Sequence, residues 1–195
     1  MGNSSEELYR GNEGWEEFAH TENWKKALEF AKVKHEGQFR DEGVPYFEHI
    51  KGVMEILIKE TNTFDDTVLT IAALHDVLED TDCTYEELKR IFGTTVADSV
   101  DLLTRKPGQS FDEYAKAIFE NEDFPYARKI KLADRLHNLR DLPKTNNPEK
   151  IVKKVKETER CILPYEGQVS GELMKKVKEE VKKLRRRPEF NENVK

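Results

Sequence analysis

The chain has 195 residues, of which 36% are hydrophobic and 37% charged, and it carries a formal net charge of −6 at pH 7. This length is enough for one domain with a substantial core, and the acidic balance argues against a nucleic-acid binder that relies on bulk electrostatics. The two cysteines, Cys83 and Cys161, are too few for a disulfide framework or a cysteine-built zinc site.

The sequence shows no targeting or membrane signal. Residues 1–6 lack both the apolar core of a signal peptide and the serine or threonine at position 6 that a myristoylation signal requires. No apolar run reaches the roughly 18 residues of a membrane-spanning helix. We therefore expect a cytoplasmic protein that does not enter a membrane.

Apolar residues recur at helical spacing from the start of the chain, and alternation with a period of two is nowhere sustained, which predicts an all-α fold. Ala27, Leu28 and Ala31 mark the first helix. A second helix follows the turn residues Gly43 and Pro45 and carries His49 near its start. The apolar run 68–74 predicts a central, buried helix that continues through residues 75–80.

Capping signals delimit the next helices. Thr84 with Glu87, and Ser110 with Glu113, have the spacing of capping boxes, in which each side chain accepts a hydrogen bond from the other residue's backbone amide. Gly93 is placed to end the first of these helices. A short helix is expected between Gly93 and Pro107, from the spacing of Val96, Val100 and Leu103.

Two prolines suit the first turns of long helices, which we predict at 125–141 and 148–163. Ser170 is placed to cap a last, strongly charged helix that ends near Pro188. We expect one domain over residues 13–187, with a flexible N-terminus at 1–12 and a loose tail at 188–195.

The stretch 75–80 places His75, Asp76, Glu79 and Asp80 in an otherwise apolar helix. Burying a carboxylate without compensation costs several kcal/mol, so these residues indicate a metal ion or a tightly paired catalytic network. In a continuous helix, His75 would stack with Glu79 and Asp76 with Asp80. The alternative is a surface helix end whose acids are simply solvated.

A second polar cluster lies in the helix predicted at 125–141. Asp134, His137 and Asn138 share one face, while Leu132, Leu136 and Leu139 form a separate apolar stripe. By itself this pattern also fits the wet side of an amphipathic helix. It gains weight beside the first cluster, because Asp134 could complete a coordination sphere begun by His75 and Asp76.

The spread pattern of His49, His75-Asp76 and Asp134 resembles the HD superfamily of metal-dependent phosphohydrolases. The fuller text at 34–40, 43–46, 72–81, 92–93 and 130–140 resembles the hydrolase domain of the RelA/SpoT family, which removes the 3′-pyrophosphate from the alarmones ppGpp and pppGpp. The likeness covers about residues 24–163. It implies a single HD-domain helical bundle around a central metal site. The chain ends soon after this part, so its layout is similar to the stand-alone metazoan homologues of SpoT.

The resemblance also implies roles for individual residues. The metal ligands would be His49, His75, Asp76 and Asp134, with Mn²⁺ as the family's usual ion and zinc or iron possible by ligand type. Glu79 and Asp80 would orient and deprotonate the attacking water, Arg40 would stabilise charge on the pyrophosphate, and Asn138 would contact the nucleotide near its ribose. Lys131, Arg135, Arg140 and Lys144 are candidates for a basic pocket around this anionic substrate, although each could equally be a solvated surface charge.

Two other functions stay open at this point. The same site could serve a phosphatase acting on NADPH or another nucleotide with a 2′- or 3′-phosphate. A regulator that binds alarmone without cleaving it is a third possibility, against which the intact Glu79 and Asp80 speak. The oligomeric state cannot be read from the sequence.

The other histidines and the aromatic residues have more ordinary expectations. We expect His20 at the surface, His35 at a helix end or lining the nucleotide pocket, and His137 packed beside the site and not binding metal. Core positions are expected for Trp24, Phe30, Phe39, Phe92 and Tyr114. Tyr46 and Phe47 are also assigned to the core in preference to a contact with guanine.

Overall fold

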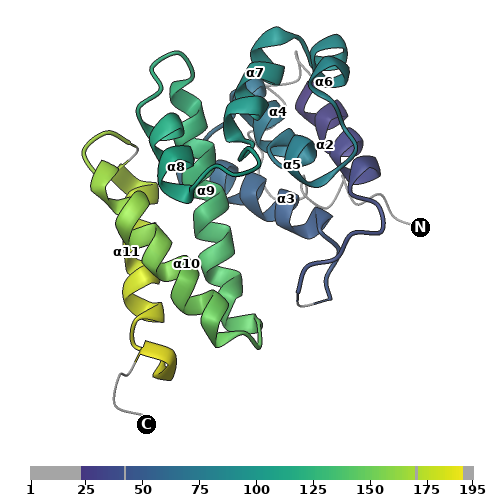
Figure 1. The fold of residues 1–195 in the computed structure, drawn as a ribbon. Coiled ribbons are helices and arrows are strands. Elements are labelled where there is room, and N and C mark those ends of the chain that lie inside the picture. Colours follow the sequence, from purple (N-terminus) through teal and green to yellow (C-terminus); the bar gives the residue numbers. More distant parts are fainter. Residues whose placement is uncertain (1–22, 42, 170, 191–195) are drawn as a thin grey trace.

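The computed structural model describes residues 23–41, 43–169 and 171–190, and within these ranges the secondary structure is helical (Figure 1). Phe39 and Pro45 form an isolated β-bridge, and no strand occurs in the described part of the chain. The all-α prediction is therefore confirmed. The expectations for His20, for the cap at Ser170 and for residues 1–12 lie outside the described residues.

The helices follow the predicted order. The first half of the chain comprises α2 (Asn23–Lys34), α3 (Phe47–Glu55), the π-helix η2 (Ile56–Glu60), α4 (Asp66–Leu74), α5 (Val77–Asp80), α6 (Tyr85–Phe92) and α7 (Thr94–Leu103). The second half comprises α8 (Phe111–Phe119), α9 (Pro125–Asp141), η3 (Leu142–Lys144), α10 (Pro148–Cys161), η4 (Leu163–Tyr165), α11 (Gly171–Leu184) and η5 (Pro188–Phe190). The limits predicted for α9 are matched, and α10 ends slightly before the predicted residue 163.

Most of the predicted caps form. Ser110 and Glu113 make the full capping box at the start of α8. At α6 only half of the box is present: the Thr84 hydroxyl accepts from the Glu87 amide, whereas the Glu87 carboxylate lies 3.0 Å from Lys34 on α2. Gly93 ends α6 with a φ of +88°, a conformation that glycine adopts without strain.

The helix predicted to run through residues 75–80 is interrupted. His75 is the C-cap of α4, and the backbone of Asp76 (φ −107°, ψ −5°) starts the separate helix α5. The carbonyl of Asp76 accepts from the amides of Glu79 and Asp80. Neighbouring residues in one continuous helix point about 100° apart, so the break allows the side chains of His75 and Asp76 to face the same point.

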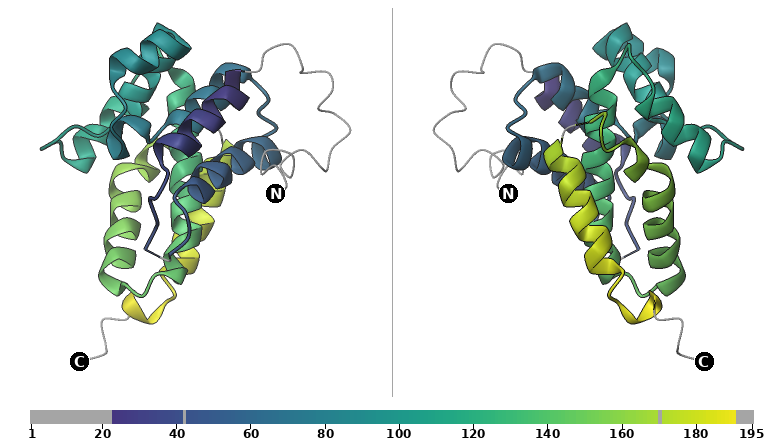
Figure 2. Two further views of the ribbon diagram at one scale, coloured as in Figure 1. Left: turned by 90° about the vertical axis from the view of Figure 1, so that its right-hand side faces the viewer. Right: turned by 90° about the vertical axis from the view of Figure 1, so that its left-hand side faces the viewer.

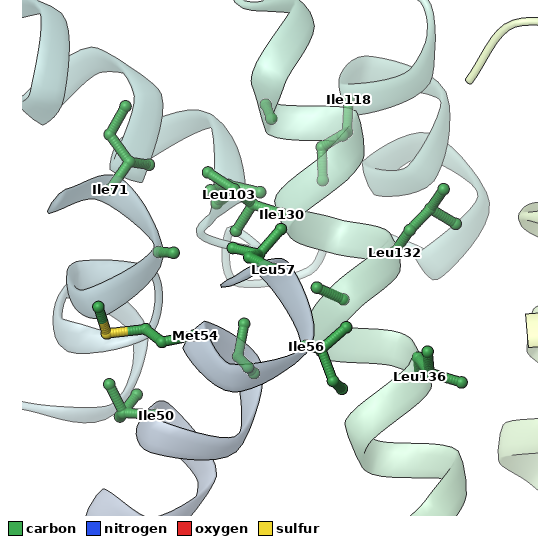
Figure 3. Packing of buried hydrophobic residues seen from close by; sticks show 14 of the residues in the cluster. Ile50, Met54, Ile56, Leu57, Ile71, Leu103, Ile118, Ile130, Leu132 and Leu136 are labelled. Atoms are coloured by element: carbon green, nitrogen blue, oxygen red, sulfur yellow. The ribbon is translucent and has the colours of Figure 1, made fainter. Parts of the chain in front are cut away.

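The core forms around α9, which packs against α3, η2, α4, α7, α8, α10 and α11. Figure 3 shows Ile130, Leu132 and Leu136 along this helix, with Ile56 and Leu57 of η2 beside it. These three α9 residues are fully buried, as are residues 71–74 of α4. In Figure 1 helix α9 lies between α10 and α11 on one side and the N-terminal helices on the other, and the turned views of Figure 2 show α10 and α11 as two separate helices along α9.

One aromatic residue expected in the core is exposed. Phe39 has 65% of its surface accessible, because it lies in the turn-rich segment between α2 and α3 and not on a helix face. Tyr114 is buried, and Trp24, Phe30 and Phe92 pack partly buried against the core. Within the described ranges, no helix combines the length and apolar character needed to cross a membrane.

Candidate metal centre and active-site cavity

Side chains from four helical segments converge on one buried point. His49 lies in the first turn of α3, His75 and Asp76 at the break between α4 and α5, and Asp134 in the middle of α9. His49 Nε2 is 3.4 Å from Asp76 Oδ2 and 3.3 Å from Asp134 Oδ1, and His75 Nε2 is 3.0 Å from the same Asp76 oxygen. The structure therefore brings together the four residues proposed as ligands.

The donor set fits a divalent metal ion. His49, His75 and Asp76 offer ligand atoms that all lie within 4.8 Å of one another. His75 Nδ1 faces the Ala72 carbonyl oxygen at 2.8 Å, which leaves its buried Nε2 directed at Asp76 and the centre of the cluster. Two imidazoles with carboxylate oxygens suit manganese, iron or zinc.

The charges of this cluster are strongly coupled. Burial alone would raise the pKa of Asp76, but the imidazoles of His75 and His49 hold it well below its usual range. Burial has the same effect on Asp134, and Lys131 and His49 outweigh it, so that its pKa is also lowered. Two buried carboxylates that stay charged create a site for a cation.

The expected acid pair lies beside this cluster. Glu79 Oε2 accepts from the backbone amide of Arg105 at 2.9 Å, and partial desolvation raises the pKa of the Glu79 carboxyl. The Tyr46 hydroxyl lies 2.7 Å from Asp80 Oδ2 and 2.7 Å from Asp76 Oδ2. Tyr46 thus links an expected metal ligand to an expected catalytic acid, and its assignment to core packing alone was incomplete.

The polar face of α9 completes this wall. The Lys131 ammonium lies 2.7 Å from Asp134 Oδ2, and the Asn138 amide nitrogen donates to Asp134 Oδ1. Asn138 Oδ1 accepts from the Arg40 guanidinium at 3.0 Å. Two hydrogen bonds therefore link Arg40 through Asn138 to Asp134, although Arg40 is far from both residues in the sequence.

These residues border a cavity of about 200 Å³, which we call the active-site cavity. Of the predicted site residues, its lining includes His49, Asp76, Glu79, Asp80, Lys131, Asp134, Arg135 and Asn138. The lining also includes Tyr46, Arg105, Phe111, Tyr114 and Lys154. Four carboxylates and the His49 imidazole thus share one small cavity with the cationic side chains of Arg105, Lys131, Arg135 and Lys154.

The sequence carried only weak signals for the additional lining residues. Lys154 belongs to a helix with many lysines, most of which are solvated, so its spacing did not distinguish it. Arg105 follows the last turn of α7, where the chain turns back toward Glu79. Phe111 lies under the Arg135 guanidinium, 4.7 Å from it, which orients that cation in the cavity wall.

Three of the cationic residues predicted at the site, Arg40, Arg140 and Lys144, are not in the cavity lining, and Arg40 lies 3.6 Å from Asp141. Arg140 donates two hydrogen bonds to Glu60 of η2, at 2.6 and 3.1 Å, because it lies on another face of α9. Lys144 pairs with Asp141 at 2.6 Å in the turn after the helix. Their positive charges are therefore directed to protein carboxylates. His35 stacks on Tyr46 with ring centroids 4.7 Å apart and does not line this cavity.

Comparisons with known proteins identify relatives of this chain. The HD domain family matches residues 27–111. The guanosine-3′,5′-bis(diphosphate) 3′-pyrophosphohydrolase MESH1 of Danio rerio is 42% identical over 123 residues, which are 60% of this chain and 67% of the relative. The guanosine-3′,5′-bis(diphosphate) 3′-pyrophosphohydrolase of Aquifex aeolicus is 37% identical over 150 residues, which cover 74% of this chain but only 21% of that protein.

A similar solved structure is that of a metazoan SpoT orthologue described as hydrolysing ppGpp. It superimposes with a TM-score of 0.73 at 30% sequence identity, and the match covers 84% of this chain and 96% of that one. The similarity thus extends over nearly the whole of that structure, whereas the chain matches about a fifth of the length of the bacterial relative.

Proposed function

The chain belongs to the HD-domain family of guanosine-3′,5′-bis(diphosphate) 3′-pyrophosphohydrolases, and we propose that it removes the 3′-pyrophosphate from ppGpp and pppGpp. The products would be pyrophosphate with GDP or GTP. The observation that carries this proposal is that one cavity joins the His49–Asp76–Asp134 cluster, the Glu79–Asp80 pair and four cationic side chains. The activity named for the relatives supports the same reaction.

We propose that His49, His75, Asp76 and Asp134 hold a divalent metal ion, with Mn²⁺ as the first candidate and zinc or iron as alternatives. When bound, such an ion supplies Lewis-acid chemistry, because it lowers the pKa of water and polarises a phosphate oxygen. The two carboxylates retain their negative charge at the site because the pKa of each is lowered. The site can therefore stay ready for a cation without first losing protons from these acids.

Glu79 is the proposed general base. The pKa of its carboxyl is raised and so lies nearer to neutral pH than the pKa of an ordinary glutamate, which suits a group that accepts a proton from water. The water oxygen would attack the phosphorus nearest the ribose, and the bond from that phosphorus to the ribose 3′ oxygen would break. The 3′ oxygen would then take up a proton and leave as the alcohol. Asp80, held by the Tyr46 hydroxyl, would orient the same water.

The substrate's phosphates need positive charge in a protein whose net charge is −6. Arg105, Lys131, Arg135 and Lys154 supply it locally, since all four line the cavity. Arg40 would contact the departing pyrophosphate, for which a planar, permanently charged guanidinium is suited. Asn138 already touches both Arg40 and Asp134, so it is placed to contact the ribose between them.

Product analysis tests the proposal. The purified, manganese-loaded protein is incubated separately with ppGpp, pppGpp and NADPH, and the products are resolved by chromatography. We expect pyrophosphate together with GDP or GTP. Orthophosphate from NADPH with ppGpp left intact would instead indicate a nucleotide phosphatase. Tight ppGpp binding without turnover would indicate a regulator, and either result would overturn the proposal.

A further inference from the structure

The imidazole of His49 is contacted on both of its nitrogens. Nε2 faces Asp76 and Asp134, on the side where the metal is proposed. Nδ1 lies 3.0 Å from Nδ1 of His137, and the two rings meet edge to face with centroids 4.8 Å apart. His137 is outside the cavity lining, so nothing in the proposed reaction uses it.

The contact between the two Nδ1 atoms has one arrangement compatible with metal binding. Nε2 of His49 must offer its lone pair to the ion, so the ring proton must be on Nδ1. That proton then points at Nδ1 of His137, which must act as the acceptor. The same Nδ1 lies 3.4 Å from Asp141 Oδ2, farther than from His49, so the proton of His137 is placed on its Nε2. His75 repeats the pattern, because its Nδ1 lies 2.8 Å from the Ala72 carbonyl oxygen while its Nε2 faces the cluster.

Helix α3 provides the space that His137 occupies. A Cβ atom built on Gly52 would lie 2.0 Å from Nε2 and 2.1 Å from Cδ2 of His137. Glycine inside a helix is less stable than alanine, so its presence in α3 calls for a packing reason. The His137 ring packs directly against this glycine, in the next turn of α3 after His49.

We propose that His137 is a positioning residue that accepts the Nδ1 proton of His49 and thereby presents Nε2 of His49 to the metal. Gly52, which has no side chain, leaves the space that the His137 ring occupies. This inference rests on the proposed metal site. It adds a residue on α9 and one on α3 that bind neither metal nor substrate. Outer hydrogen-bond partners of this kind orient a ligand and raise its basicity.

The first measurement is made without metal or substrate. Nitrogen-15 NMR of the metal-free protein reports which nitrogen of His49 carries the proton. We expect Nδ1 to carry a proton in the parent protein and to lose it in His137→Leu, in which Nε2, facing Asp76 and Asp134, keeps the ring proton. His137→Asn should retain the parent tautomer, because its amide oxygen lies at the same position along the side chain as Nδ1 of histidine.

The second measurement is Mn²⁺ affinity by calorimetry. Removal of an outer partner typically weakens metal binding by about 10- to 100-fold, so we expect that loss in His137→Leu and a value near the parent in His137→Asn. Gly52→Ala should resemble His137→Leu, because the new methyl group displaces the ring. Gly171→Ala is the matched control, since a Cβ there meets nothing within 4 Å.

The outcomes separate the possible failures. If His137→Leu keeps both the His49 tautomer and a Mn²⁺ affinity within about two-fold of the parent, His137 only fills space and the inference is wrong. If Gly52→Ala does not fold, the pair of His137 variants still decides. A protein that shows the expected tautomer change but leaves ppGpp intact would overturn the proposed function and not this inference.

Discussion

Asp76 and Glu79 lie one turn apart in the chain, yet their surroundings give the two carboxylates different chemistry. Asp76 contacts His49 and His75 and has a lowered pKa, as expected of a metal ligand. Glu79 contacts the Arg105 amide and has a raised pKa, as expected of a proton acceptor. Two carboxyl groups with pKa values moved in opposite directions indicate a division of roles within one site.

Substitutions should separate these roles. We expect Asp76→Asn to lose Mn²⁺ binding and activity together. Glu79→Gln should retain Mn²⁺ while kcat falls by about 100-fold or more, the usual contribution of a general base. Calorimetry with Mn²⁺ and initial rates on ppGpp measure the two properties. If both variants kept activity within a few-fold of the parent, the assignment of these residues would be wrong.

The Tyr46 hydroxyl also acts on single side chains of the site, because it hydrogen-bonds to both Asp76 and Asp80. Tyr46→Phe keeps the ring that stacks on His35 but removes the hydrogen bonds to charged groups, each worth about 1.5 to 3 kcal/mol. We expect kcat to fall by about ten-fold or more with little change in folding. Tyr85→Phe is the control, since it removes a hydroxyl that contacts Asp98, which does not line the cavity.

At the scale of elements, the π-helix η2 is fastened to two distant helices by one carboxylate. Glu60 accepts from Arg140 on α9 at 2.6 and 3.1 Å and from Lys176 on α11 at 2.8 Å. The hydrogen bonds from Arg140 are the main cause that lowers the pKa of Glu60 to about 2. This network occupies Arg140 with structure and explains why that residue does not reach the cavity.

The lowered pKa gives a signed prediction. A carboxyl whose folded pKa is about 2 contributes stability that is present above the ordinary value of about 4.3 and is lost as the pH falls toward 2. We expect Glu60→Gln to lower the free energy of unfolding by about 1 kcal/mol at pH 7, a figure reduced for partial exposure.

Urea denaturation at pH 7 and at several points below pH 4 measures this difference. The gap between the variant and the parent should narrow in acid, and a gap of constant size would contradict the linkage. Glu172→Gln is the control, because Glu172 is mostly exposed and its ion pair with Lys176 is longer, at 3.5 Å.

At the scale of the whole molecule, the cluster of proposed metal ligands joins parts of the chain that are far apart in sequence. His49, His75 and Asp76 come from the N-terminal helices, whereas Asp134 comes from α9, around which the second half of the chain packs (Figure 1). A metal ion held by all four would therefore stabilise the association of the two parts and not one helix alone.

Metal removal should consequently lower thermal stability. At free Mn²⁺ about 100 times its Kd, binding to the folded state adds about 2.7 kcal/mol. For a chain of this size that corresponds to a rise in Tm of about 5 to 10 °C. Thermal melts with Mn²⁺ and with a chelator measure the shift. Asp134→Asn should fold but show little rise in Tm on addition of Mn²⁺. A rise equal to that of the parent protein would exclude Asp134 as a ligand.

The sequence by itself determined where the helices lie and which kinds of side chain form the site. The limits of α9, the capping box of Ser110 and Glu113 and the end of α6 at Gly93 follow from interactions between residues a few positions apart. Such local interactions can be read from spacing alone. The resemblance carried by the HD motifs added which distant residues should meet.

Only the tertiary structure decided how those residues meet. The break at Asp76 allows two adjacent side chains, His75 and Asp76, to face the same point, and the packing of His137 against Gly52 depends on how α9 crosses α3. The same crossings bring Lys154 to the cavity and direct Arg140 to Glu60. Contacts between helices are set by packing over the whole chain, and the periodicity of one helix records which face is buried but not which partner that face meets.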